Sequence, residues 1–318
     1  MSYRGRQSAS IENDQVRVTV LREGGHIAEI LHKATGVNPL WTPPWPSMEP
    51  SAFHDSGAAV DARLLAGIMG HNVCLDIFGA PSEEEAAAGL GVHGEGPVVP
   101  YEIETAGTRL AMKAALPLAQ IQFERTIELH ESTLEIDETV ASLTAFDRPI
   151  GWTQHVTLGP PFLERGVTEF EIPATRAKTF EGVFGADDYL EPDTEFAPED
   201  HVFTRAAKSS AFTTHLMDPA REQAYFIARH PGLGLEFGYR WRRADFPWLG
   251  IWEENHSRMA APWNGQTLAR GMEFGVSPFP ETRRQMVDRG TLFGVPAYRW
   301  LPAGGRLEAR YSAFVRAS

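Results

Sequence analysis

Three residues, far apart in a chain of 318, have side chains that could move protons on a small substrate. His93 lies in the glycine-rich run from Gly89 to Gly96, and glycine allows positive φ angles and a close approach of backbone to ligand. His155 lies in the middle of a predicted strand, and Glu273 lies in a late, mostly apolar one. A carboxylate and histidines of this kind can serve as general acid and general base.

Glu273 is informative because burial of an unpaired carboxylate costs several kcal/mol or raises its pKa. We therefore expect Glu273 to have a partner or a chemical role. The structural alternative is an ion pair with Arg270 or Arg240. For the histidines, the alternatives are a turn residue at position 93 and an exposed cross-strand residue at position 155.

The elements around these residues read as short strands. Apolar and polar residues alternate in period two, from the hairpin at 14–31 onward, without a long helical period or a sustained strand–helix alternation. Further strands are predicted at 101–106, 109–115, 121–130, 133–140, 151–159, 223–230, 233–241, 248–254, 268–275 and 305–315. This pattern predicts an all-β fold, a large antiparallel two-layer β-sandwich, in a single domain spanning residues 1–318.

Two segments interrupt the strands. Residues 38–100 are rich in Pro and Gly and read as a long, partly irregular excursion, with at most a short helical turn at Glu83–Ala88. Such a segment in a compact domain is more often a functional loop than a neutral connector. A second stretch, at 183–201, is polar and rich in Pro and Asp.

Composition limits the class of partner. The formal net charge is −13, which repels polyanions, so nucleic acid is not an expected partner. The single cysteine, Cys74, fits a reducing cytoplasm. We expect neither export nor a membrane span, because an apolar leader and an 18-residue apolar stretch are both missing. The histidines at 26, 32, 54, 71 and 93 are scattered, so no metal or other cofactor is expected.

Combined, the motifs resemble those of aldose 1-epimerases, the galactose mutarotases. The resemblance rests on the His-Gly of the glycine-rich loop, the mid-strand Gln154-His155, the late Glu273, and the Pro-Gly turn between Tyr298 and Leu307 before the last strand. It covers most of the chain in order and spacing. It implies a divergent member of the galactose mutarotase-like superfamily and a small-molecule sugar as the partner.

The resemblance also implies roles. In those enzymes a carboxylate removes the proton of the anomeric hydroxyl while a histidine protonates the ring oxygen, so that the ring opens and closes as the other anomer. By position, Glu273 resembles the base, His155 the acid, and His93 the histidine that orients the sugar. His155 would then be protonated near neutral pH, favoured by a nearby carboxylate. Five further residues are expected to bind the substrate: Trp152, Gln154, Trp252, Arg63 and His71.

Departures from the pattern leave other functions open. The enzymes carry an arginine ahead of the first histidine, where this chain has Leu64 to Asn72 with Arg63 nearby, and Gln154-His155 replaces their Asn-His. One alternative is a non-catalytic sugar-binding or sensing protein. Another is a sugar-phosphate epimerase, for which Arg229, Arg240, Arg242 and Arg243 supply cations. The sequence gives neither the sugar nor the oligomeric state.

Overall fold

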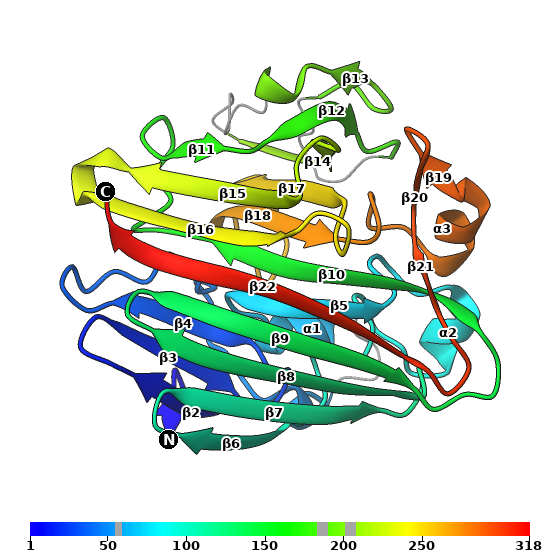
Figure 1. Cartoon of the computed structure of the whole chain (residues 1–318), viewed down its shortest axis with the longest axis horizontal. Coiled ribbons are helices and arrows are strands. Elements are labelled where there is room, and N and C mark those ends of the chain that lie inside the picture. Colours follow the sequence, from blue (N-terminus) through cyan, green and yellow to red (C-terminus); the bar gives the residue numbers. More distant parts are fainter. Residues whose placement is uncertain (55–58, 183–189, 201–207) are drawn as a thin grey trace.

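Two large antiparallel sheets pack face to face in the computed structural model of the chain, which describes residues 1–54, 59–182, 190–200 and 208–318. Figure 1 shows the two layers, with the smaller sheet nearer the viewer. The all-β sandwich predicted from the strand pattern is confirmed. Part of the polar stretch at 183–201 lies outside the described residues.

The larger sheet has twelve strands among the described residues. In spatial order they are β1 (Ser2–Tyr3), β2 (Arg6–Glu12), β3 (Val16–Leu21), β4 (Ile27–His32), β5 (His71–Asp76), β10 (Arg148–Leu158), β18 (Leu268–Gly275), β17 (Trp248–Asn255), β14 (Ser209–Met217), β12 (Ala174–Thr179) and β13 (Glu195–Phe196), with β21 (Arg299–Leu301) also paired to β10. The strand that carries His155 therefore lies in the middle of the sheet, between β5 and β18.

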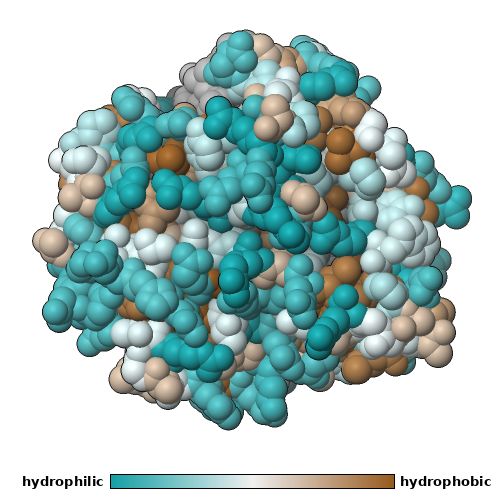
Figure 2. Space-filling model, viewed as in Figure 1, coloured by the Kyte–Doolittle hydropathy of each residue, from teal (hydrophilic) through white to brown (hydrophobic). Residues whose placement is uncertain are grey.

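The smaller sheet has eight strands in the described residues. In spatial order they are β11 (Glu169–Glu171), β15 (Gln223–His230), β16 (Leu235–Arg242), β22 (Arg306–Ala317), β9 (Thr133–Ser142), β8 (Ile121–His130), β7 (Arg109–Leu116) and β6 (Glu102–Ala106). Burial alternates along β8 and β9, because one face packs on the core and the other meets solvent. The outer face is largely hydrophilic in Figure 2.

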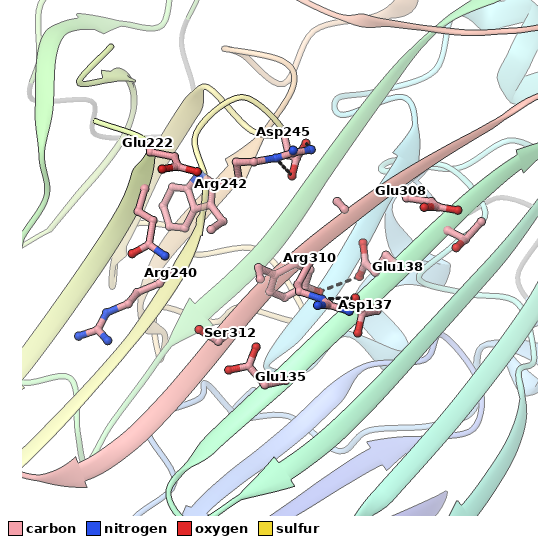
Figure 3. A pocket seen from close by; sticks show the side chains of 15 residues that line it. Glu135, Asp137, Glu138, Glu222, Arg240, Arg242, Asp245, Glu308, Arg310 and Ser312 are labelled. Carbon is pink, nitrogen blue, oxygen red and sulfur yellow. Dashed lines mark hydrogen bonds and ion pairs between the residues drawn. The ribbon is translucent and has the colours of Figure 1, made fainter. Parts of the chain in front are cut away.

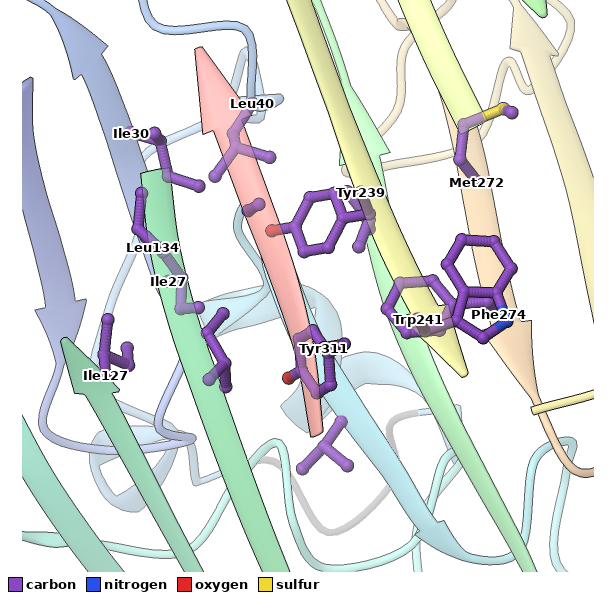
Figure 4. Packing of buried hydrophobic residues seen from close by; sticks show 14 of the residues in the cluster. Ile27, Ile30, Leu40, Ile127, Leu134, Tyr239, Trp241, Met272, Phe274 and Tyr311 are labelled. Atoms are coloured by element: carbon purple, nitrogen blue, oxygen red, sulfur yellow. The ribbon is translucent and has the colours of Figure 1, made fainter. Parts of the chain in front are cut away.

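The core lies between the sheets and takes residues from Ile11 to Val315. Large aromatic side chains dominate its centre: Trp241 stacks on Phe274 at a centroid distance of 4.3 Å, and Tyr239 and Tyr311 pack beside them. Figure 4 shows this packing. Since Phe274 belongs to β18, the residues that alternate with it on that strand point away from the core.

The excursion at 38–100 is less irregular than expected. It contains β5, together with the short helices α1 (Ala62–Gly67) and α2 (Glu83–Ala87), the second at the predicted helical turn. All six residues of β5 are buried, so the strand shows no period-two pattern. A buried central strand of this kind gives no alternation for sequence inspection to find.

Short elements close the ends of the sandwich. They are the 3-10 helices η1 (Pro50–Ala52), η2 (Pro198–Asp200) and η3 (Pro231–Leu233), the helix α3 (Arg283–Arg289), and the two-stranded sheet of β19 (Thr291–Leu292) and β20 (Val295–Pro296). No helix in the described ranges has the length and apolar character needed to cross a membrane.

Candidate active site

Strands β10 and β18 bring His155 and Glu273 side by side. The two residues are direct partners in the antiparallel register, and their neighbours Val156 and Met272 point into the core. His155 and Glu273 therefore lie on the opposite face of the larger sheet, which we call the site face. His155 Nε2 lies 3.2 Å from Glu273 Oε1, and the side chains are 6% and 2% exposed. We refer to these two residues as the acid–base pair.

Glycines make room for the carboxylate of Glu273. Gly271 and Gly275 flank it on the same strand and face, and Gly250 of β17 is its register partner. A Cβ atom added to Gly271 would lie less than 3.0 Å from Glu273 Oε1, a separation that real Cβ atoms essentially never show. The carboxylate thus occupies space that only a glycine at position 271 leaves open.

His93 reaches the pair from the loop before β6. Its backbone has a φ of 67°, in the left-handed region, and its ring centroid lies 5.0 Å from that of His155. Nδ1 lies 2.5 Å from the carbonyl oxygen of Phe78. A carbonyl only accepts, so Nδ1 carries the proton, and in the neutral ring Nε2 has the lone pair. The structure places the three predicted catalytic residues in one cluster.

Burial shifts the pKa values of all three groups toward the uncharged form. It lowers the pKa of His93 to about 4, against a smaller opposing effect of the Phe78 carbonyl. Burial, and next the neighbouring His93, lower the pKa of His155, while burial raises that of Glu273. The ligand-free pair therefore favours a protonated carboxyl beside a neutral imidazole. This is opposite in direction to the protonated His155 expected from a nearby carboxylate.

Aromatic side chains surround the cluster on the site face. Trp252 of β17 is 6% exposed, and its ring centroid is 6.2 Å from that of His155. Trp263 packs edge-on against it at 6.1 Å and continues the surface to Trp41 and Trp45. The guanidinium of Arg258 lies over Trp263 at 4.8 Å. The expected substrate-binding residue Trp252 therefore does lie beside the acid–base pair.

Three other expected substrate-binding residues lie on the opposite side of the larger sheet. Trp152 and Gln154 are the third and first residues before His155 on β10, and both side chains donate to Glu138, at 3.0 and 2.5 Å. His71 bonds Gln154 Oε1 at 3.0 Å. Arg125 completes this buried network with an ion pair to Glu138 at 2.7 Å. These residues join the two sheets rather than contacting the acid–base pair.

Two arginines do not have the contacts considered from the sequence, which were substrate binding for Arg63 and an ion pair with Glu273 for Arg270. Arg63 is exposed on α1, where its Nε donates to the carbonyl of Pro50 at 3.2 Å. Arg270 forms a buried ion pair with Glu253. The side chain that pairs with Glu273 among the described residues is therefore a histidine and not an arginine.

The cations considered for a phosphate group belong to the smaller sheet. Arg229 and Arg240 lie on β15 and β16, and Arg242 and Arg243 lie at the end of β16 and in the turn after it. Arg240 and Arg242 line a surface pocket of about 700 Å³ that also contains Glu135, Asp137 and Arg310. Figure 3 shows this pocket on the outer face of β9, β22 and β16. The four arginines therefore do not lie beside His155 and Glu273.

Asn72 is a residue that sequence inspection missed. It is the register partner of His155 on β5, so the site face carries Asn72, His155 and Glu273 in one row across three strands. Asn72 is fully buried, and within the described residues its side-chain oxygen and nitrogen have no hydrogen-bond partner. The only signal in the sequence is that Asn72 directly follows His71. Consecutive strand residues point to opposite faces, so the side of Asn72 follows once that of His71 is known.

Among the described residues, no group of three or more His, Cys, Asp or Glu side chains is placed to hold a metal ion.

Comparison with known proteins identifies the fold. No protein-family model matches the chain, and a search of curated proteins found no significant sequence match. A candidate aldose 1-epimerase from Klebsiella pneumoniae superposes with a TM-score of 0.71 at 13% identity, over 98% of this chain and 79% of that one. A candidate aldose 1-epimerase from Escherichia coli K12 gives 0.70 at 12%, over 99% and 100%.

A galactose mutarotase-like protein from Clostridium acetobutylicum gives a TM-score of 0.66 at 12% identity, over 100% of this chain and 97% of that one. The chain therefore has the fold of the galactose mutarotase-like sandwich, as predicted, although its sequence identity to these proteins is only 12–13%.

Proposed function

We propose that this protein is an aldose 1-epimerase-like isomerase that interconverts the anomers of a free sugar. The contact between His155 Nε2 and Glu273 Oε1 carries the proposal. Anomer interconversion acts on two oxygens bonded to one carbon, the anomeric hydroxyl and the ring oxygen. An acid and a base that serve these two oxygens have to lie next to each other, as this pair does.

The reaction balances within the pair. The ionised carboxyl of Glu273 takes the proton of the anomeric hydroxyl, the bond between the anomeric carbon and the ring oxygen breaks, and protonated His155 gives its proton to that oxygen. Rotation of the aldehyde and the reverse transfers close the other anomer. The pair carries one proton throughout, and the reactive form differs from the ligand-free form only by a proton shift between Oε1 and Nε2.

His93 and Trp252 would bind and orient the sugar. With a pKa near 4, His93 is neutral in neutral solution, so its Nε2 can accept a hydrogen bond from a sugar hydroxyl. The indole of Trp252 offers a flat apolar surface for the C–H face of a pyranose. Both rings lie within 6.2 Å of the His155 ring, centroid to centroid.

The test is the rate at which α-D-glucose and α-D-galactose convert to equilibrium, followed by polarimetry or proton NMR. We expect acceleration by the protein and a loss of about 10²- to 10⁴-fold in Glu273→Gln and in His155→Gln. Glu308→Gln, on the outer strand face of the smaller sheet, serves as control and should keep full activity. The proposal would be wrong if the protein accelerated the conversion of no aldose in a panel, or if Glu273→Gln kept full activity.

One observation favours a second candidate, a sugar-binding protein without catalysis. Burial holds both members of the pair toward their uncharged forms, which suits hydrogen bonding to hydroxyls. The two candidate functions are distinguished by comparing sugar binding with the rate of anomer interconversion. Calorimetric binding of an aldose without any change in its rate of anomer interconversion supports the binding protein.

A further inference from the structure

The amide of Asn72 stands out among the polar groups of the site face. A buried amide without hydrogen-bond partners destabilises the fold, so such groups are rare unless a ligand satisfies them. Here both polar atoms of one side chain lack a partner within the described residues, beside the acid–base pair. On the same face, Thr153 Oγ1 and Trp252 Nε1 are also buried and have no hydrogen-bond partner among the described residues.

The register gives the order of these groups across the sheet. Glu273, His155 and Asn72 occupy successive strands β18, β10 and β5, and neighbouring strands lie about 4.8 Å apart. Asn72 therefore lies beyond His155, on the side away from Glu273. A ligand that contacts all three must present its polar atoms in this order.

An aldohexose in its pyranose form does so. Its anomeric hydroxyl and ring oxygen share the anomeric carbon, and the ring oxygen is bonded in turn to C5, which carries the exocyclic C6 hydroxymethyl group. With Glu273 at the anomeric hydroxyl and His155 at the ring oxygen, the next polar atom in this direction is the C6 hydroxyl. An amide donates through its nitrogen and accepts through its oxygen, so it can pair with a hydroxyl in either sense.

We propose that Asn72 binds the C6 hydroxyl and makes the site selective for hexoses over their 6-deoxy and pentose counterparts. The inference rests on the proposed function for the order of roles, and it goes beyond that function by naming the substrate class. It assigns to β5 the recognition of the substrate end that takes no part in the chemistry.

The test compares D-galactose with D-fucose, its 6-deoxy form, and D-glucose with 6-deoxy-D-glucose, on the wild-type protein. We expect kcat/KM at least about tenfold lower for each 6-deoxy sugar, since a buried amide left unpaired penalises the analogue that lacks the hydroxyl. Equal kcat/KM values for the two members of each pair overturn the inference, with no variant needed.

The variant Asn72→Leu has a similar volume and no polar atoms. We expect it to lower kcat/KM for the hexoses and leave the 6-deoxy sugars within about threefold, so that the ratio approaches one, while the Tm of the ligand-free protein rises. Thr267→Val is the matched control, because Thr267 Oγ1 is also buried without a partner but lies before the start of β18. It should leave the ratio unchanged. Equal losses for both sugars, or a lower Tm, identify a merely structural Asn72.

Failure of the proposed function is distinguishable from failure of this inference. If the wild-type protein accelerates no aldose, the same sugars are titrated by calorimetry. Tighter binding of the hexose than of its 6-deoxy form, abolished in Asn72→Leu, keeps the inference while the catalytic proposal falls. Equal binding of the two, or no binding of either, removes the inference as well.

Discussion

The carboxylate of Glu273 fills the space beside Gly271 that a Cβ atom would need, because any Cβ at position 271 would come within 3.0 Å of Oε1. We expect Gly271→Ala to push the carboxyl away from His155 Nε2 and to lower kcat at least about tenfold, since a misplaced base loses its alignment with the reacting proton. Steady-state kinetics on folded, monodisperse protein check this.

Gly275→Ala is the matched control for that change. It lies on the same strand and face, two residues beyond Glu273, but its Cβ would meet the side chain of Thr153 and the carbonyl oxygen of Trp152 instead of the carboxylate. We expect both variants to unfold more easily in urea and only Gly271→Ala to lose activity beyond its loss of stability. An active Gly271→Ala would show that the carboxylate position in the ligand-free protein does not matter for turnover.

The ion pair between Arg125 and Glu138 should be the most sensitive electrostatic contact of the core. Both side chains are fully buried, so Glu138→Gln leaves the charge of Arg125 uncompensated. We expect a loss of about 3–5 kcal/mol in the free energy of unfolding, measured by urea denaturation. Asp137→Asn provides the comparison, because Asp137 pairs with Arg310 on the exposed face of the same strand and should cost about 1 kcal/mol or less.

His26 should make the protein lose stability in acid. Burial, and next the charge of Arg6, lower its pKa to about 3 from 6.5. The unfolded chain therefore binds a proton that the folded one does not between these pH values, and this residue removes about 1.4 kcal/mol of stability per pH unit as the pH falls through that window. We expect the free energy of unfolding, measured in urea at pH 6.0 and 4.5, to fall less between these pH values in His26→Gln than in the wild-type protein. An equal fall in the two proteins would contradict the lowered pKa of His26.

Trp252 should act through binding rather than through chemistry. Trp252→Phe keeps an aromatic face beside His155 and removes the buried indole N–H. We expect KM to rise about 3- to 10-fold at nearly constant kcat, as for the loss of roughly 1 kcal/mol of uniform binding. Trp300→Phe, an exposed tryptophan on β21, is the control and should leave KM unchanged.

The strands with one solvated face could be predicted from the sequence almost to the residue. Strand β8 has the bounds expected for 121–130, because each polar residue that points outward interrupts the apolar ones. Strand β5 could not be predicted in this way, because both of its faces are buried. This strand carries Asn72 next to His155, so the proposed role of Asn72 could not be inferred from the sequence pattern.

The site was predictable in part, for a geometric reason. His155 and Glu273 are 118 positions apart, and their contact depends on the register of β10 with β18, which no local pattern encodes. Trp152 and Gln154 precede His155 on the same strand, and His71 lies on the neighbouring strand β5. Closeness along or between strands does not decide which face of the sheet a side chain occupies. Trp152 and Gln154 lie across the sheet from His155, as their hydrogen bonds to Glu138 show.

This alternation separates two kinds of mutational freedom on β10. Odd-numbered positions such as Thr153, His155 and Thr157 lie on the site face, and even-numbered positions such as Trp152, Gln154 and Val156 hold the sheets together. Substrate preference can therefore be retuned through one set while the other keeps the strand in register. A library restricted to Thr153 and Thr157 would vary the site face while His155, Glu273 and the side chains that join the two sheets stay unchanged.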